Sequence, residues 1–207
     1  MLTENNFVSA FILLFILLNP FLIIIYVIDI VQEKSLSEFS GILLRACSIS
    51  AVVFIVFALS GNAIFDRVLQ TNFASFQIFG GLIFLIIGIR FVFQGVDTVR
   101  NLRGKSEHIA GSIAMPILIG PGSIGASIII GERLEPLFAV LSIAAALILT
   151  YVIMLLLKSL HDYVKPRNEK LIQRYIEIMG RVTALVIGAF SVEMIMQGIK
   201  TWMKVLI

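Results

Sequence analysis

Apolar residues fill six long runs of the chain, and polar residues gather in the short segments between them. About 20 consecutive apolar residues are enough to cross the hydrocarbon core of a bilayer as an α-helix. Strands that cross a membrane alternate polar and apolar residues, whereas these runs do not. The pattern predicts an all-α membrane protein with six transmembrane helices. The runs are residues 7–28, 46–65, 68–89, 109–131, 136–157 and 182–199.

Two of the predicted helices contain helix-breaking residues near their centres. Asn19 and Pro20 lie in the first run, and the fourth run contains Gly120, Pro121, Gly122 and Ser123. Proline lacks a backbone donor and crowds the carbonyl four residues earlier, and glycine makes bending cheaper. Unpaired backbone groups cost several kcal/mol in hydrocarbon, so such breaks persist only inside protein or beside water. We therefore expect a binding site at these positions.

The two halves of the chain resemble each other at a spacing of 100 residues. "IFGGLIFLIIG" (78–88) aligns with "IMGRVTALVIG" (178–188), including two glycines at equal spacing. Three spans in each half would place the second half upside down relative to the first. We therefore predict one integral membrane domain, residues 1–207, with inverted repeats of about 1–100 and 108–207 and broken helices 1 and 4. Secondary transporters use this arrangement and bind substrate at the midplane.

Glu193 is the one acidic residue within the sixth run. Its short side chain reaches water poorly from this depth, so we expect it to face the protein interior or a wet cavity. It is the candidate for proton coupling. No His or Cys cluster has metal-ligand spacing, and no glycine-rich phosphate loop occurs. We therefore expect no metal, no cofactor and no enzymatic activity.

Composition and charge agree with a multi-pass membrane protein. The chain is 59% hydrophobic and 14% charged, and it has no basic face of the kind that binds nucleic acid. Ten basic residues fall on the side of the longer loops and four on the side of the termini. The positive-inside rule then places both termini outside the cell. The expected partners are the lipid bilayer and a small-molecule substrate, and a homo-oligomer stays open.

Several of these motifs together resemble the MarC family, also classed as neutral amino acid transporters of prokaryotic inner membranes. They are "FILLFILLNP", "FQIFGGLIFLIIG", "PILIGPGS" and "IMG…VEMIMQGI", and they span almost the whole chain. The chain departs from the family pattern at Leu22 and Ile25, where glycine and proline are usual, at Ser112, where proline is usual, and at Arg90. The resemblance implies a multi-pass inner-membrane transporter of small neutral amino acids.

The leading interpretation is a proton-coupled secondary transporter, with export as one direction, for small neutral amino acids or similar metabolites. The opened helix centres would bind the carboxylate and ammonium of a zwitterion, and Asn19 and Ser123 would add polar contacts. A passive channel for a small solute is one alternative, because aquaporins also combine six spans with inverted halves. A non-transporting membrane partner protein is the other.

Overall fold

The computed structural model describes residues 2–61, 63–94 and 109–206, and helices make up nearly all of them. No strand occurs in these ranges, so the all-α prediction is confirmed. The helices are α1 (Leu2–Leu18), α2 (Pro20–Tyr26), α3 (Ile28–Glu33), α4 (Leu36–Ser60), the π-helix η1 (Ile64–Leu69), α5 (Phe73–Gln94), α7 (Ile109–Ile113), the π-helix η2 (Ala114–Leu118), α8 (Pro121–Arg133), α9 (Pro136–Val164) and α10 (Glu169–Leu206).

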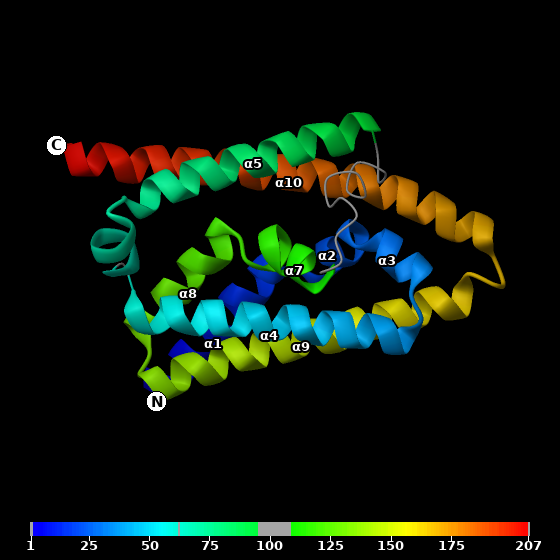
Figure 1. The fold of residues 1–207 in the computed structure, drawn as a ribbon, viewed down its shortest axis with the longest axis horizontal. Helices are drawn as coiled ribbons and strands as arrows, with labels where there is room; N and C mark the ends of the chain where they lie inside the picture. Colours follow the sequence, from blue (N-terminus) through cyan, green and yellow to red (C-terminus); the bar gives the residue numbers. More distant parts are fainter. Residues whose placement is uncertain (1, 62, 95–108, 207) are drawn as a thin grey trace.

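Two pairs of long helices form the outer edges of the molecule (Figure 1). Helix α4 lies beside α9, and α5 lies beside α10 with opposite chain direction. The shorter helices α2, α3, α7 and α8 lie between the two pairs, and α1 packs against α9 and passes behind α4 and α9 in this view. Both chain termini lie at the same end of the long axis, and the connection from α9 to α10 lies at the other.

Five helical segments of the described chain are long and apolar enough to cross a membrane. Only 22–39% of their most apolar windows is buried inside the protein, so the remaining apolar surface suits contact with lipid. They are Phe7–Tyr26, Leu36–Ser60, Phe73–Gln94, Pro136–Val164 and Gln173–Met203. The predicted fourth span, residues 109–131, is absent from this set because it is divided into three pieces. Its longest piece, α8, has 13 residues, too few to cross alone.

The first apolar segment changes direction at Asn19, between α1 and α2. Asn19 adopts a left-handed conformation, with φ 38° and ψ 81°. Its side-chain oxygen accepts a hydrogen bond of 3.2 Å from the backbone N–H of Leu22. Asparagine tolerates this conformation better than other residues with a Cβ, and its side chain caps the new helix. Pro20 then occupies the first position of α2, where its missing N–H costs nothing.

The segment before α8 is interrupted over a longer stretch. Met115, inside η2, has extended dihedral angles of φ −114° and ψ 129°. Ile119 and Gly120 follow outside any helix, and α8 starts at Pro121. The prolines of this segment explain where the helices stop, because each removes one backbone hydrogen bond. Here, too, proline is the first residue of the second helix.

Several helix boundaries and contacts recur 100 residues apart. Helix α3 ends at Glu33 and α8 at Arg133, and α4 starts at Leu36 and α9 at Pro136. Helix α2 packs on α9, and correspondingly α8 packs on α4. Gly131 of α8 lies so close to the carbonyl of Ala58 in α4 that an added Cβ would overlap it.

Lys158 of α9 is the residue that corresponds to Ala58 at this spacing, and it is buried. The Lys158 ammonium donates hydrogen bonds of 2.7 Å to the Val31 carbonyl and 2.6 Å to the Asp162 carboxylate. His161 Nδ1 lies 3.2 Å from the same carboxylate. The Val31 carbonyl lies in the last turn of α3, where the helix dipole attracts a cation. Lys158 therefore links α9 to α3 and provides a hydrogen-bond donor for a carbonyl in the last turn of α3.

Glycines bring α5 and α10 into close contact along their length. A Cβ on Gly88 would lie 3.2 Å from the backbone nitrogen of Gly188, and one on Gly198 would lie 2.9 Å from the Ala74 carbonyl. Gly81 similarly faces the carbonyl of Ser191 at 3.0 Å. Small residues at these crossings let main chains approach, which is the usual basis of helix association in lipid. The two helices therefore form a tight pair.

Candidate functional site

A cavity of about 530 Å³ lies between the α5–α10 pair and the helices α1, α2 and α8. Sites for small molecules usually occupy about 300–1,000 Å³. Its walls are largely apolar, with Leu13, Leu17, Leu18, Leu22 and Ile23 from α1 and α2, Phe73 and Phe84 from α5, Ile128 and Ile129 from α8, and Ile187, Phe190 and Met194 from α10. A small number of polar groups stand out against this lining.

The predicted residues around the second interruption all line this cavity: Gly120, Pro121, Gly122 and Ser123. Gly122 occupies the second position of α8, where a backbone N–H has no partner within the helix. The N-terminus of a helix also carries partial positive charge. The start of α8 therefore offers donors and a favourable potential to an anionic or polar group in the cavity.

Ser123 binds the backbone around the interruption. Its hydroxyl accepts a hydrogen bond of 2.9 Å from the Gly120 N–H, and its one hydrogen is donated to the carbonyl of Leu118, at 2.7 Å, with the carbonyl of Gly120 also within reach at 3.0 Å. Only 6% of the residue is exposed. The hydroxyl therefore stabilises the opened backbone, and its bonding capacity is largely used within the protein.

Asn19 and Pro20 are not among the residues that line the cavity, although Leu18 and Leu22 on either side of them are. Pro20 is buried, and the Asn19 side chain caps α2. The structure thus brings together four of the six residues expected to bind substrate. Asn19 and Pro20 shape the backbone beside the site.

Glu193 lines the cavity from α10 and belongs to a chain of amide contacts. The Gln197 side-chain amide donates a hydrogen bond of 2.9 Å to the Glu193 carboxylate. Gln77 of α5 donates in turn to the Gln197 oxygen at 3.2 Å. Gln77 and Gln197 were not singled out as site residues from the sequence. The spacing of four residues between Glu193 and Gln197 was the available signal, because such residues share a helix face.

The charged residues in the lining are both acidic. Glu132, near the end of α8, joins Glu193, and no Lys, Arg or His is among the described residues that line the cavity. Both glutamates are exposed residues, so water screens the negative potential that their carboxylates create at the cavity. The site still favours a cationic group at one place and offers the positive end of α8 at another.

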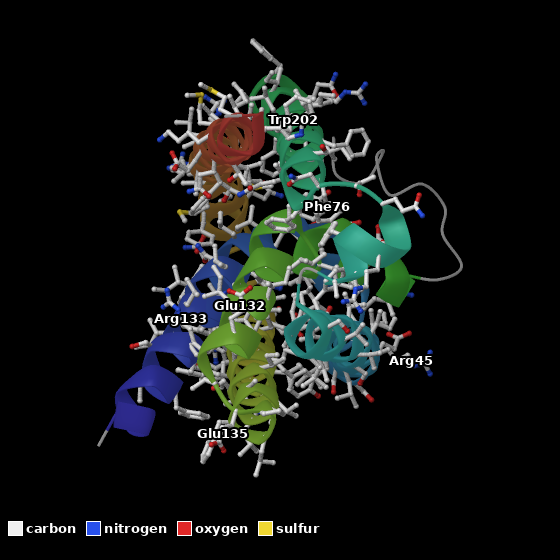
Figure 2. All side chains as sticks on the ribbon, turned by 90° about the vertical axis from the view of Figure 1, so that its left-hand side faces the viewer. Arg45, Phe76, Glu132, Arg133, Glu135 and Trp202 are labelled. Atoms are coloured by element: carbon white, nitrogen blue, oxygen red, sulfur yellow. The ribbon has the colours of Figure 1, made fainter. Side chains whose placement is uncertain are left out.

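The cavity extends towards the end of the molecule where both termini lie. Its lining runs from Gly120 at the interruption to Glu132 in the last turn of α8 and Phe73 at the start of α5. Figure 2, viewed from that end, shows Glu132 between the α5–α10 pair and the α4–α9 pair. A solute could reach the interrupted backbone from this end.

The chain matches the model of the "MarC family integral membrane protein" over residues 4–203. A UPF0056 membrane protein of Aquifex aeolicus is 27% identical, with 96% of this chain and 94% of the relative covered. One of Methanocaldococcus jannaschii is also 27% identical, with 94% and 87% covered. The UPF0056 inner membrane protein YhgN of Shigella flexneri is 23% identical, with 97% and 99% covered. No solved structure has significant similarity to the chain.

Proposed function

The chain belongs to the MarC family of integral membrane proteins, and from this premise we propose that it is a secondary transporter. Its substrates would be small neutral amino acids or similar small metabolites, their transport would be coupled to protons, and export would be one direction. The observation that carries the proposal is the cavity of about 530 Å³ bounded by the start of α8 and by Glu193.

The proposed architecture is two inverted repeats of three spans each, with interrupted first and fourth spans. The recurring boundaries support it, since α4 and α9 start at Leu36 and Pro136. The contact of Gly131 with Ala58 and that of Val31 with Lys158 also relate positions 100 residues apart. An inverted repeat places equivalent half-helices on either side of one central site.

The proposed binding mode assigns the two ends of a zwitterion to different walls. The carboxylate would lie at the N-terminus of α8, near the backbone N–H of Gly122. Because the Ser123 hydroxyl already lies against the carbonyls of Leu118 and Gly120, we assign the ammonium to other groups than the opened backbone. The acidic residues of the cavity are the groups of suitable charge.

We further propose that the protein lies in a prokaryotic inner membrane with both termini outside. The name of the Shigella flexneri relative supports the compartment, and the excess of basic residues in the opposite loops supports the orientation. In this orientation the cavity would face the outside of the cell. The structure would then correspond to an outward-facing form of the transporter.

The test is solute flux in proteoliposomes that contain the full-length protein and labelled alanine. Gly122→Leu adds a large side chain to the cavity lining and should reduce flux at least tenfold. Gly41→Leu is the matched control, because Gly41 is exposed on α4 and a Cβ there would meet nothing within 4 Å. Equal flux in the wild type and Gly122→Leu would contradict the site. Vesicles that swell osmotically without a proton gradient would instead indicate a passive channel, and the absence of any flux a non-transporting protein.

A further inference from the structure

We propose that Phe73 controls the passage of solutes from the open end of the cavity, where both termini lie, to the start of α8, and that its ring limits the size of the solutes that pass. The inference rests on the proposed transport function in that it takes the cavity as the route of the solute. The role of Phe73 can nevertheless be tested without any measurement of transport.

Phe73 contacts α8 between the interruption and the open end. A Cβ on Gly125 would lie 3.0 Å from the Cζ atom of Phe73, at the tip of its ring. Gly125 follows Gly122 by three residues, about one helical turn, and precedes Glu132 by seven residues, about two turns. A solute that moves from Glu132 towards the start of α8 therefore passes the level of the Phe73 ring.

The packing of α5 on α8 gives the same position for Phe73. Gly80 lies so close to the ring of Pro121 that an added Cβ would overlap it, so α5 touches α8 directly at the interruption. Phe73 precedes Gly80 by seven residues, about two turns towards the open end and on the same face of α5. Gln77 and Phe84 share this face, and both line the cavity together with Phe73.

The ring of Phe73 reaches α8 because Gly125 has no side chain. An alanine at this position would press on the ring tip, which would have to turn about its own side-chain bonds. At Gly80 and Pro121, by contrast, the main chain of α5 itself meets α8. A side chain that can rotate therefore joins the two walls of the cavity at the level of Gly125.

Hydrogen bonds fix the backbone around Phe73. The Asn72 side-chain oxygen accepts a hydrogen bond of 2.8 Å from the Ala74 N–H, and the Asn72 carbonyl accepts one of 2.9 Å from the Ser75 N–H. The indole N–H of Trp202 donates to the Ser75 hydroxyl at 3.2 Å and so links this turn to α10. The first turn of α5 is thus held in place, and displacement of the ring requires rotation of the side chain.

Two aromatic neighbours favour the present position of the ring. The ring centroids of Phe65 and Phe73 lie 5.1 Å apart at an interplanar angle of 71°, and those of Phe73 and Phe76 lie 6.2 Å apart at 39°. Edge-on and tilted pairs of this kind are attractive. Phe65 is itself only 1% exposed, so it gives the Phe73 ring a fixed support. Rotation of Phe73 has to break these contacts.

The ring is uncharged, so it restricts solutes by size and not by charge. A solute as small as alanine passes beside the ring in its present position. A bulkier solute has to displace the ring from Phe65 and Phe76 first. Phe73 therefore favours small solutes over large ones at the step of entry, before any contact with the start of α8.

The experiment measures how fast a cysteine behind the ring reacts with thiol reagents of two sizes. The full-length protein in lipid nanodiscs carries Cys47→Ala, which removes the native thiol, and Gly122→Cys. A Cβ at Gly122 meets only the Leu17 side chain, at 3.8 Å, so a cysteine fits. The reagents are trimethylammonium-ethyl and triethylammonium-propyl methanethiosulfonate, which have the same charge and differ in bulk. Glu132→Cys, in front of the ring, is the reference position.

The quantity compared is the rate constant of the small reagent divided by that of the large one. This ratio should be roughly tenfold higher at Gly122→Cys than at Glu132→Cys, because a rate falls exponentially with its barrier. Phe73→Ala should bring the ratio at Gly122→Cys close to that at Glu132→Cys, and Phe73→Trp should raise it. A change in the reactivity of the thiol alone would alter both rate constants and leave the ratio unchanged.

Phe76→Ala is the matched control. Phe76 belongs to the same aromatic group as Phe73 and Phe65, but it is not among the described residues that line the cavity. Its substitution should change the ratio at Gly122→Cys by less than about twofold. A change as large as that of Phe73→Ala would show that general loosening of the aromatic group, and not the ring of Phe73, admits the large reagent.

An unchanged ratio in Phe73→Ala contradicts the inference. If Phe73→Ala does not fold, Phe73→Leu decides, because it stays apolar but no longer reaches Gly125, and the ratio should again fall. An unchanged ratio in Phe73→Leu would then overturn the proposal. Absence of alanine flux in the wild type would overturn the proposed function alone, since the labelling ratios support or contradict the role of Phe73 without it.

Discussion

The ammonium of Lys158 lies 2.7 Å from the carbonyl oxygen of Val31, 127 residues away in sequence, and donates a hydrogen bond to it. Only 2% of Lys158 is exposed. The equivalent contact in the other half brings the backbone of Gly131 against Ala58 without any side chain between them. The two halves thus make equivalent helix contacts in different ways. A lysine hydrogen bond links α9 to α3, whereas a glycine lets α8 pack directly on the backbone of α4.

Lys158→Met should destabilise the protein. The substitution retains an apolar stem but leaves the Val31 carbonyl without its donor, which costs about 1–3 kcal/mol for a buried group. Lys170→Met is the matched control, because Lys170 is exposed at the start of α10 and should change stability by less than about 0.5 kcal/mol. The midpoint of thermal unfolding in detergent measures both. Equal midpoints for the two variants would show that the hydrogen bond does not stabilise the fold.

Gly131→Ala should destabilise the protein, although the substitution adds only one methyl group. The new Cβ would overlap the Ala58 carbonyl, and because main-chain atoms cannot turn away as a side chain can, α8 and α4 must separate. Overpacking of this kind costs about 1–3 kcal/mol. Gly41→Ala in α4 has open space around it and should instead stabilise the helix by about 0.5–1 kcal/mol. Opposite signs for the two substitutions are expected in the same unfolding assay.

Ser123→Ala should cost more than Ser127→Ala, although both serines are buried in α8. Removal of the Ser123 hydroxyl leaves the Gly120 N–H without an acceptor at the interruption, a loss of about 1–3 kcal/mol. The Ser127 hydroxyl donates to the Ser123 carbonyl, which lies inside α8 and can accept a backbone hydrogen bond there. Loss of the Ser127 hydroxyl therefore leaves no backbone group of the interruption without a partner. Denaturation of both variants in the same detergent compares them. A larger effect at Ser127 would contradict the role given to Ser123.

Substitutions at Asn19 should rank by backbone conformation. Asn19→Gly loses the cap but fits a φ of 38°, so the cost should be a few tenths of a kcal/mol. Asn19→Ala loses the cap and must also hold a left-handed conformation, which adds about 1–2 kcal/mol. Thermal unfolding should place the glycine variant between the wild type and the alanine variant. An alanine variant as stable as the glycine variant would indicate that α1 and α2 join differently.

The two helix interruptions could be predicted from the sequence, because proline lacks a backbone N–H and disrupts any helix that it would otherwise continue. Helices α2 and α8 start at Pro20 and Pro121. Helix ends marked by polar residues were harder to predict from the sequence. The uncharged run predicts a second span over residues 46–65, whereas α4 covers Leu36–Ser60. A count of uncharged residues passes over the capping box of Ser35 and Glu38, in which each side chain accepts a hydrogen bond from the other residue's backbone.

The site was accessible from the sequence only in part. Glycine and proline marked the start of α8, but whether the polar side chains beside the breaks face a ligand or the backbone depends on their rotamers. Ser123 and Asn19 bind the backbone. The contact of Gln77 with Gln197 depends on how α5 packs on α10, and the two residues are 120 positions apart. No local pattern connects them.

The meeting of Gly88 and Gly188 has a mechanical consequence. Where two main chains touch without side chains between them, any sliding of one helix along the other would drive the neighbouring side chains into the backbone. The α5–α10 pair must therefore move as one unit. Among the described parts of the chain, any movement of this pair relative to the other helices has to bend the non-helical connections that lead into it, residues 70–72 before α5 and residues 165–168 before α10.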